Sequence, residues 1–251
     1  MSTHQPPIKL GKPFIQLLTV DSTNNYALNL LKDNLAGNGT AIFAAEQSNG
    51  RGQMGKIWKA NANENIIISI IVDISAVHIQ NQFNLLAMAA LGSYDFFNKY
   101  AGDETAIKWS NDIYWRDKKA GGILIETTQH QQKRFAIVGI GININQVQFD
   151  ESLINPVSLK QITGKHFNVV ELAKELCDCI GNWYDVLLKN NHQELLSFYN
   201  SHLYKKNKEV KLKKGNIKFN CIIKSVNSNG ELQVENGLSD SFKFGEVEWI
   251  I

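Results

Sequence analysis

The sequence contains little cysteine, and this limits both its redox chemistry and its metal chemistry. Its 251 residues include three cysteines, Cys177, Cys179 and Cys221, which are too few for a disulfide framework. Cys177 and Cys179 stand two apart in a predicted helix and point in different directions, so they are not expected to hold a metal. Such thiol use is typical of a reducing cytosol, and the expected location is therefore cytoplasmic.

Long hydrophobic runs and a strong excess of charge are also missing. No run approaches the ~18 apolar residues of a membrane helix, and residues 1–12 lack the apolar centre of a signal peptide. The 26 Lys and Arg residues and 24 Asp and Glu residues give a net charge of +2, so no global field favours nucleic acid or an acidic membrane. A hydrophobic content of 43% is enough for a core. We expect a globular protein with no membrane partner.

The pattern of apolar residues divides the chain into two parts, 1–204 and 205–251. In the first part we predict strands at 14–20, 40–45, 66–74, 120–126 and 134–145. A strand-like run at 107–115, interrupted by a polar Ser-Asn-Asp, is predicted to form a β-hairpin with 120–126. We predict a helix that is capped by 21–24 and runs to about 34, and helices at 80–100, 153–163, 169–189 and 192–202. In the second part, five short runs at 209–213, 217–225, 231–234, 241–244 and 247–251 are separated by turn signals. This spacing predicts a small β-barrel after a mixed α and β domain.

The predicted barrel is rich in lysine. It has nine lysines against six acidic residues, with a cluster at 205–214. A nucleic-acid surface usually interleaves arginines and aromatic residues with its lysines, and this cluster lacks both. A solvated face or a docking surface for an acidic partner is the favoured interpretation.

A glycine-rich segment connects two predicted strands: Gly50-Arg51-Gly52-Gln53-Met54-Gly55-Lys56-Ile57-Trp58, here called the glycine loop. Glycine lets the backbone approach a ligand, while Arg51 and Lys56 offer positive charge to a phosphate or carboxylate. The spacing matches neither the phosphate loop ending in Gly-Lys-Ser/Thr nor the dinucleotide-binding pattern. Taken alone, the segment is either a solvated connection or an anion site.

Two further stretches carry polar residues with alternative roles. Asp21-Ser22-Thr23-Asn24 either caps a helix or directs the helix N-terminus at an anion. Asp112 and Lys119 flank a predicted hairpin tip, where a half-buried Lys–Asp pair would hold an ammonium beside a reacting anion. Exposed lysines in a solvated turn are the alternative.

The strands that follow contain residues that weaken a strand or add polar groups to it. Gly121 and Gly122 weaken the return strand unless something must approach its backbone. Asn143 and Asn145 alternate with isoleucines, so we expect them on one face and the isoleucines on the other. These amides could cap a turn or bond a base or a phosphate.

Four stretches of this kind stand in a fixed order: Asp21-Ser22-Thr23-Asn24; Gln47–Gly55; Lys108-Trp109-Ser110-Asn111-Asp112 with Lys119–Glu126; and Gly139-Ile140-Gly141-Ile142-Asn143. Together they resemble the biotin protein ligases, also called biotin–[acetyl-CoA-carboxylase] ligases. The resemblance covers 14–145 in motifs and the remainder in architecture. It implies an α+β fold: a mixed-sheet catalytic domain of the biotin and lipoyl ligase type at 1–204, followed by an SH3-like barrel at 205–251.

The resemblance also implies a reaction, that of a carbon–nitrogen bond-forming ligase that uses ATP and Mg²⁺. The carboxylate of biotin attacks the α-phosphate of ATP, which gives biotinyl-5′-AMP and pyrophosphate. A lysine of a biotin carboxyl carrier protein then takes the biotinyl group. A lipoate or octanoate ligase or transferase on the same fold is the alternative.

Individual roles follow from the same resemblance. The residues expected to act in catalysis are Lys119, Arg51 and Asp112, and Asp112 is also the candidate metal ligand. Those expected to bind biotin are Ser22, Thr23, Asn24, Gln47, Gly50, Arg51, Gly52, Gln53, Lys119, Gly121 and Gly122. Those expected to bind ATP are Lys56, Trp58, Lys108, Asn111 and Asn143.

Members of the family that also repress transcription carry a winged helix ahead of the catalytic domain. This chain has no room for one, so we expect a monofunctional ligase without specific DNA binding. Catalytic domains of this family can pair through sheet edges. A homodimer is therefore possible, and the strand that ends in Asn145 is one candidate edge.

Two residues depart from the family pattern. Gln53 stands where many members have an arginine, and Ser110 stands where the Lys-Trp-Pro-Asn-Asp pattern has proline. The serine should relax the local backbone without removing a functional group.

A neutral amide at Gln53 should hold the phosphate of the adenylate less firmly than a guanidinium would. We therefore expect the protein to release more free biotinyl-AMP than its Gln53→Arg variant does. Chromatography of the nucleotides released in the absence of an acceptor measures this difference. Equal release from the two proteins would contradict the prediction.

Overall fold

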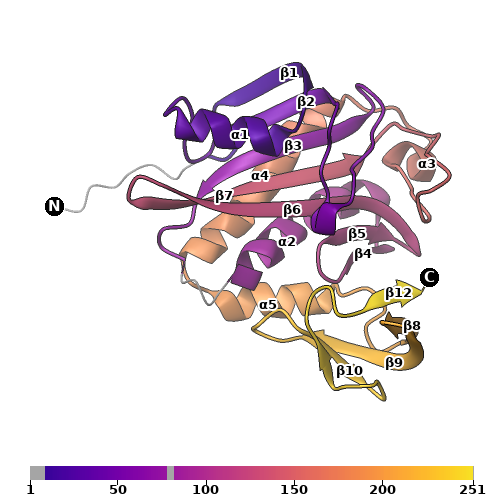
Figure 1. The fold of residues 1–251 in the computed structure, drawn as a ribbon. Helices are drawn as coiled ribbons and strands as arrows, with labels where there is room; N and C mark the ends of the chain where they lie inside the picture. The colour runs from indigo at the N-terminus through magenta and orange to yellow at the C-terminus, as the bar shows by residue number, and fades with distance from the viewer. Residues whose placement is uncertain (1–8, 78–81, 251) are drawn as a thin grey trace.

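The computed structural model describes residues 9–77 and 82–250. Predicted features that fall on 1–8, 78–81 or 251, including the start of the helix predicted at 80–100, lie outside the described residues. Within the described ranges the chain forms a seven-stranded and a five-stranded sheet, with helices against the first (Figure 1). None of the helices in these ranges is both long and apolar enough to cross a bilayer.

The seven-stranded sheet is mixed, as predicted. Its order is β1 (Phe14–Val20), β2 (Ala41–Gln47), β3 (Asn65–Asp73), β7 (Lys133–Asn143), β6 (Lys118–His130), β5 (Asp112–Trp115) and β4 (Thr105–Lys108). The β1–β2 pair is parallel, and the other neighbours pair antiparallel. The interior strand β3 is rich in β-branched isoleucine and valine, as suits a strand with side chains packed on both faces.

Helices cover both faces of this sheet. They are α1 (Thr23–Lys32), α2 (Gln82–Ala101), α3 (Leu159–Thr163), α4 (Val169–Leu188) and α5 (His192–Ser201). Figure 1 shows α1 on the near face, here called the front face, and α2 and α4 on the far, back face. Because side chains alternate along a strand, Ile68 and Ile70 of β3 join the large core on the back, whereas Ile71 packs with Leu31 under α1.

The second sheet is antiparallel throughout. Its order is β11 (Ser241–Phe242), β10 (Leu232–Glu235), β9 (Ile217–Val226), β8 (Glu209–Lys214) and β12 (Glu248–Ile250). The five predicted runs are confirmed, and the arrangement is consistent with an SH3-like barrel. The indole Nε1 of Trp109 donates to the Gly230 carbonyl at 2.9 Å, which joins this barrel to the first sheet close to the β4–β5 turn.

Three predictions about the elements need correction. The run 107–115 forms two strands, β4 and β5, with Lys108 opposite Asp112, because its polar residues make a turn. The strand ending near Asn145 is not an edge, since β7 lies between β3 and β6. The helix predicted from 153 begins only at Leu159, because Pro156 disfavours helix in the residue before it.

The packing of α1 on the front face can be tested with two leucines. Leu31 is 2% exposed and Leu18 is 86% exposed. We expect Leu31→Ala to lower the free energy of unfolding by about 2–5 kcal/mol, and Leu18→Ala to change it by no more than about 0.5 kcal/mol. Urea denaturation measures both. Similar losses for the two variants would mean that α1 is not packed on the sheet as described.

Candidate functional site

Three glycines remove side chains from the front face where β7 and β6 pair: Gly139, Gly141 and Gly122. Gly141 lies directly opposite Gly122 in the ladder. A Cβ atom at Gly141 would overlap the Trp58 indole, and one at Gly139 would overlap the Asn24 side chain. Glycine is therefore required here, because these two side chains lie against the backbone of the sheet.

The N-terminus of α1 forms a buried hydrogen-bond network with β2 and β3. The amide and the hydroxyl of Thr23 both donate to Oε1 of Gln47, at 2.7 and 3.0 Å. Oγ of Ser69 lies 2.7 Å from Oγ1 of Thr23 and 2.6 Å from Oδ1 of Asn24. Ser22 is the N-cap residue, but its side chain makes no capping bond. Ser22, Thr23, Asn24 and Ser69 are all at most 4% exposed, so the polar groups of this α1 network are buried and held in place before any ligand binds.

Glu126 connects the α1 network to the glycine loop. Its Oε2 accepts from Nδ2 of Asn24 at 2.7 Å and from Nη2 of Arg51 at 2.6 Å. The Arg51 and Glu126 side chains are 38% and 39% exposed, so the ion pair remains accessible to solvent. Arg51 therefore lies against the sheet and not free in solution.

The glycine loop folds back on itself in front of β7 and β6 (Figure 1). The amide of Trp58 donates to the Gly50 carbonyl at 2.9 Å, and a Cβ at Gly50 would overlap the Trp58 carbonyl oxygen. At the loop tip, Nε2 of Gln53 donates to the Ile123 carbonyl at 3.2 Å. Nδ2 of Asn111 donates to the same carbonyl at 2.9 Å, so the tip and the β4–β5 turn meet on one backbone group.

Lys119 and Asp112 form the predicted pair. Nζ of Lys119 lies 2.7 Å from Oδ1 of Asp112, and their side chains are 35% and 20% exposed. The backbone of Lys119 is fixed on its outer side: its amide donates to the Asn155 carbonyl at 2.7 Å, and its carbonyl accepts from the Val157 amide at 2.9 Å. A Cβ at Gly122 would lie 3.5 Å from Nζ of Lys119, so the ammonium is close to the glycines of the sheet.

Lys108 occupies a different environment. It is 9% exposed, and its Nζ lies 3.0 Å from the Tyr114 hydroxyl. The same atom lies 4.6 Å and 5.4 Å from the ring centroids of Tyr114 and Trp249. Burial lowers the pKa of Lys108 to about 8, against the opposing effect of the Asp112 carboxylate. The contacts of this ammonium are therefore mainly aromatic, and they include a residue of the barrel.

Two of the predicted asparagines support the scaffold. Nδ2 of Asn143 donates to the Val157 carbonyl at 3.1 Å, and Nδ2 of Asn145 donates to the Phe167 carbonyl at 2.9 Å. These bonds hold the segments that follow β7 to the end of that strand. Asn143 thus supports the segment that pairs with Lys119, and its predicted contact with ATP stays a prediction.

Three other residues that were predicted to bind biotin or ATP lie in different parts of the structure. Gly52 belongs to the turn of the glycine loop, where its amide donates to the Lys56 carbonyl at 2.7 Å, and the Lys56 side chain is exposed. Gly121 neighbours Gly122 on β6, so the alternation of the strand directs it to the opposite, back face. A Cβ there would lie 3.1 Å from the Ile142 side chain.

Two buried polar atoms of the site have no hydrogen-bond partner among residues 9–77 and 82–250. They are Nε1 of Trp58 and Oε1 of Gln53. Buried polar atoms in native proteins normally have a partner. A donor over the glycines and an acceptor at the loop tip are therefore without a partner in the part of the chain that the structure describes.

The sequence prediction omitted Ser69 and Glu126 from the site. Both follow runs of apolar residues: Ser69 interrupts the isoleucines of β3, and Glu126 comes directly after Ile123-Leu124-Ile125. A lone polar residue in such a run is a signal that could have identified them, because burying an unbonded polar group is costly.

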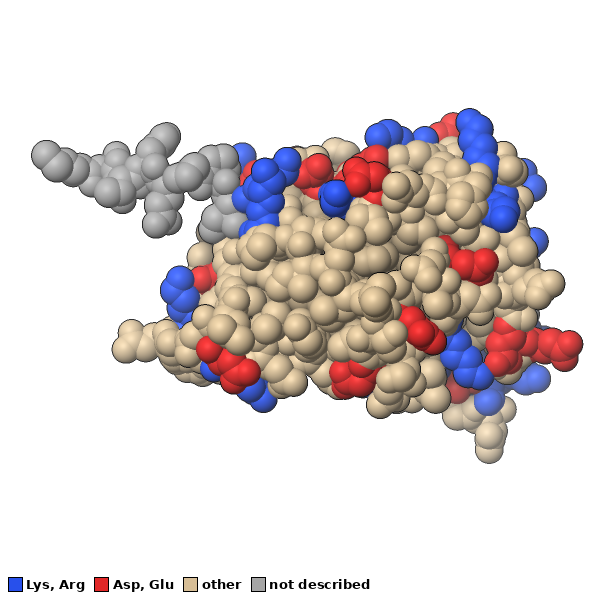
Figure 2. All heavy atoms as spheres, turned by 90° about the horizontal axis from the view of Figure 1, so that it is seen from above, with Lys and Arg blue, Asp and Glu red and all other residues tan. Residues whose placement is uncertain are grey.

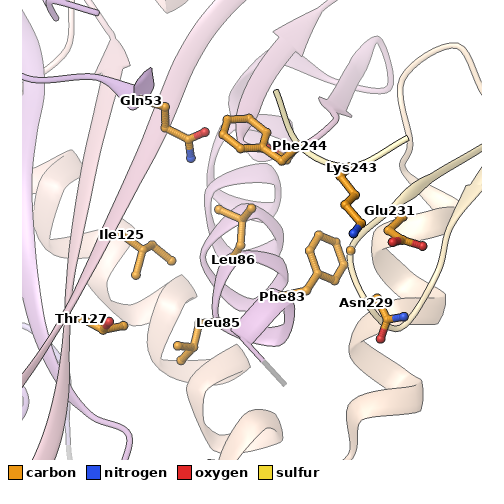
Figure 3. A pocket seen from close by; sticks show the side chains of 12 residues that line it. Gln53, Phe83, Leu85, Leu86, Ile125, Thr127, Asn229, Glu231, Lys243 and Phe244 are labelled. Carbon is orange, nitrogen blue, oxygen red and sulfur yellow. The ribbon is translucent and has the colours of Figure 1, made fainter. Parts of the chain in front are cut away.

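A cavity of about 750 Å³ lies beside the loop tip, between β6, α2 and the barrel (Figure 3). Its apolar lining includes Phe83, Ile125 and Phe244. Gln53 and Ser110 also line it, so the two departures from the family pattern meet at one cavity. Pairing between β5 and β6 ends at Gly122, and beyond that residue β6 has no strand partner on this side among the described residues.

Comparison with known proteins agrees with this geometry. Residues 17–143 match the sequence model of the biotin/lipoate A/B protein ligase family. The chain is 31% identical over 179 residues to the bifunctional ligase/repressor BirA of Bacillus spizizenii, covering 70% of this chain and 54% of that protein. It is 33% identical over 145 residues to the biotin–[acetyl-CoA-carboxylase] ligase of Mycobacterium tuberculosis, covering 55% and 53%. The chain spans about half the length of these relatives.

Among solved structures, the biotin protein ligase of Aquifex aeolicus in complex with biotin and ATP superposes with a TM-score of 0.77 at 26% identity. The superposition covers 93% of this chain and 97% of that one. The region that matches the family model contains the α1 network, the glycine loop, the Lys119–Asp112 pair and the glycines of β6 and β7. The chain therefore belongs to the biotin/lipoate A/B protein ligase family.

Proposed function

We propose that this protein is an ATP-dependent biotin protein ligase. The observation that carries the proposal is the convergence of four separate motifs on the front face of one sheet. There the α1 network, the glycine loop and the Lys119–Asp112 pair surround side-chain-free backbone. The names of the relatives from Mycobacterium tuberculosis and Aquifex aeolicus support the same activity.

The α1 network suits the ureido head of biotin. That ring is neutral and carries two N–H donors and one carbonyl acceptor. Thr23, Asn24 and Ser69 offer hydroxyl and amide groups at a buried position, which is how small-molecule sites fix the orientation of a ligand. The dithiolane ring of lipoate has no such groups. A buried polar site discriminates against an analogue that leaves it unbonded, so biotin is the favoured acid.

The first half-reaction joins two anions, and the site supplies positive charge for this. The carboxylate oxygen of biotin forms a bond to the α-phosphorus of ATP, and pyrophosphate leaves with the electron pair of the broken P–O bond. The ammonium of Lys119, oriented by Asp112, stabilises the charge that develops on the phosphoryl oxygens. Arg51 and Lys56 add positive charge from the glycine loop.

In the second half-reaction the acceptor lysine must be present as a neutral amine. Its nitrogen bonds to the biotinyl carbonyl carbon, AMP leaves, and the nitrogen loses a proton to give the amide. A glycine loop that covers the adenylate would exclude water from this anhydride. The Arg51–Glu126 and Gln53–Ile123 contacts support such a covering position.

Magnesium fits the site as a companion of the nucleotide. Within the described ranges, no three His, Cys, Asp or Glu residues are grouped as they would be in an all-protein metal site. Mg²⁺ usually takes one or two carboxylates and completes its coordination with water and substrate phosphates. Asp112 would supply the carboxylate, and the ion would neutralise phosphate charge.

Pyrophosphate–ATP exchange tests the first half-reaction. We expect exchange with biotin, and none with lipoate, octanoate or no acid. Lys119→Ala should lower the exchange rate by about 10²–10³, the usual loss when one stabilising donor is removed. The adjacent lysine gives a matched control: Lys118 is exposed, and Lys118→Ala should stay within about twofold of wild type.

Other outcomes of this experiment would change the proposal in different ways. Exchange with lipoate or octanoate in place of biotin would keep the fold and overturn the substrate. Equal losses in Lys119→Ala and Lys118→Ala would remove the assigned role of Lys119. No exchange with any of the acids would overturn the ligase.

The acceptor is proposed to be a biotin carboxyl carrier protein that docks at the 750 Å³ cavity. Figure 3 shows Gln53 of the glycine loop and Phe244 of the barrel at the same end of the cavity, with Ile125 of β6 on one wall. An unpaired strand edge offers backbone groups to an incoming polypeptide, and β6 beyond Gly122 is such an edge.

An arginine at Ile125 should block this surface without touching the front face. We expect Ile125→Arg to raise the KM for a carrier domain about tenfold or more, because burying an unpaired charge costs several kcal/mol. Biotin-dependent pyrophosphate exchange should stay within about threefold of wild type. Leu35→Arg, at a 72% exposed position that follows α1 and lies outside the cavity, is the control. Unchanged transfer kinetics in Ile125→Arg would contradict docking at the cavity.

Nucleic acid is not proposed as a partner. Four barrel lysines form ion pairs: Lys205 with Asp117, Lys213 with Glu248, Lys214 with Glu246 and Lys224 with Glu235. Such pairing reduces the charge available to phosphates. Figure 2 views the molecule from the side opposite the barrel, and there it shows scattered charges around a broad uncharged area with no continuous basic patch.

A homodimer stays a prediction. The sheet has two edge strands, β1 and β4. The β4 edge is bridged, because Ile107 pairs with Leu203. The β1 strand, Phe-Ile-Gln-Leu-Leu-Thr-Val, contains no charged residue and is the edge left for a second copy, since charge is the common protection of free edges.

A further inference from the structure

We propose that Glu126 is a positioning residue that couples occupation of the α1 network to closure of the glycine loop. Its effect on the loop can be measured without any ligand, whereas its effect on catalysis rests on the proposed function. No role in binding or catalysis follows for Glu126 from the motifs, and its carboxylate is the point at which two parts of the site meet.

A continuous series of hydrogen bonds runs through Glu126. One carboxylate oxygen, Oε2, accepts from both Asn24 at 2.7 Å and Arg51 at 2.6 Å. Asn24 in turn lies 2.6 Å from the hydroxyl of Ser69, which is bonded on to the rest of the α1 network. A shift of the Asn24 amide toward a ligand therefore changes the surroundings of the oxygen that holds Arg51.

The same series returns to the base of the glycine loop. Oε1 of Gln47 accepts from Thr23 at the far end of the network. A Cβ at Gly50 would lie 2.8 Å from Nε2 of Gln47, so this amide packs directly on the loop where it leaves β2. The loop is thus in contact with the network at both Gly50 and Arg51.

The two ends of the Arg51–Glu126 pair differ in how firmly they are held. Glu126 belongs to β6 and lies opposite Ile137 of β7, a residue that is 1% exposed in the core beneath α1. Arg51 lies between two glycines in the loop. Because an ion pair that is about 40% exposed is weak, it can break while the sheet stays intact. Glu126 is then the fixed side of a contact that closes the loop.

Other charged groups near Arg51 do not replace Glu126. The charge of Arg51 helps to lower the pKa of Asp21, but the Asp21 carboxylate is already bonded, because it accepts from Asn25 at 2.6 Å. Among the described residues, the one ion pair found for Arg51 is that with Glu126. Removing the charge of Glu126 should therefore release the loop and not transfer Arg51 to a neighbouring carboxylate.

The test uses Glu126→Gln, which keeps an acceptor oxygen for Asn24 and removes the charge that holds Arg51. The measurement is hydrogen-exchange mass spectrometry of the full chain without ligand. We expect the amides of 49–58 to exchange about fivefold faster than in wild type, because loss of an exposed ion pair favours opening of the loop by about that factor. Biotin should protect these amides in wild type and protect them less in the variant. Glu171→Gln is the control, because it removes an exposed pair with Lys174 on α4.

A double-mutant cycle separates positioning through Arg51 from a general structural effect. Arg51→Gln should accelerate loop exchange as Glu126→Gln does, and the double variant should show no further increase. In the kinetic arm, Glu126→Gln should raise the KM for biotin about fivefold with little change in kcat, since the loop and not the reacting groups is altered.

The outcomes distinguish this inference from the proposed function. Loop exchange in Glu126→Gln equal to wild type, or additive effects in the double variant, would overturn the role of Glu126 even if biotin-dependent pyrophosphate exchange is normal. Absence of that exchange in the wild-type protein would overturn the ligase and leave the loop result standing.

Discussion

The rest of the structure depends on one constraint. Two side chains pack directly against the backbone of the β6–β7 ladder, at positions where the strands carry glycine. Trp58 and Asn24 lie so close to Gly141 and Gly139 that no side chain fits there. A sheet weakened by glycines needs support elsewhere, and the buried isoleucines of β3 and the helices behind it provide this. Polar groups can then occupy the front face of the sheet, while most of the apolar surface whose burial stabilises the fold lies on the back face.

The local pattern of apolar and polar residues was sufficient to predict most helices and strands, because strands, helix caps and turns depend mainly on residues that are neighbours in the sequence. The runs at 217–225 and 231–234 appear as β9 and β10 with small shifts, and Gly164 ends α3 in the left-handed conformation at φ 72°. The Lys119–Asp112 pair was also predictable, since both residues flank one hairpin. In contrast, the bond from Asn24 to Glu126 joins residues 102 apart, and nothing in the local pattern specifies such a contact. The aromatic surroundings of Lys108 include Trp249 of the barrel. This contact also joins residues far apart in the sequence, so the local pattern could not predict it.

The barrel belongs to the site more closely than its sequence indicates. A Cβ at Gly245 would lie 3.2 Å from the Met54 methyl group, so the barrel touches the tip of the glycine loop. Phe244 packs on Trp109 with ring centroids 6.3 Å apart, next to the turn that carries Asn111. Through these contacts the second sheet limits where the loop and the β4–β5 turn can lie. A small barrel can influence a reaction in this way without binding a substrate itself.

The fixed backbone of Lys119 has a consequence for how such an enzyme can change its sequence. Asn155 and Val157 bond to Lys119 from the segment after β7, a segment that includes none of the four motifs. Its residues are partly exposed, as Ile154 is at 72%, and exposed connections usually tolerate insertions. Here an inserted residue would shift the bonds that hold the backbone of Lys119. The length of this connection, more than the identity of its residues, is therefore what natural variation or protein engineering has to preserve.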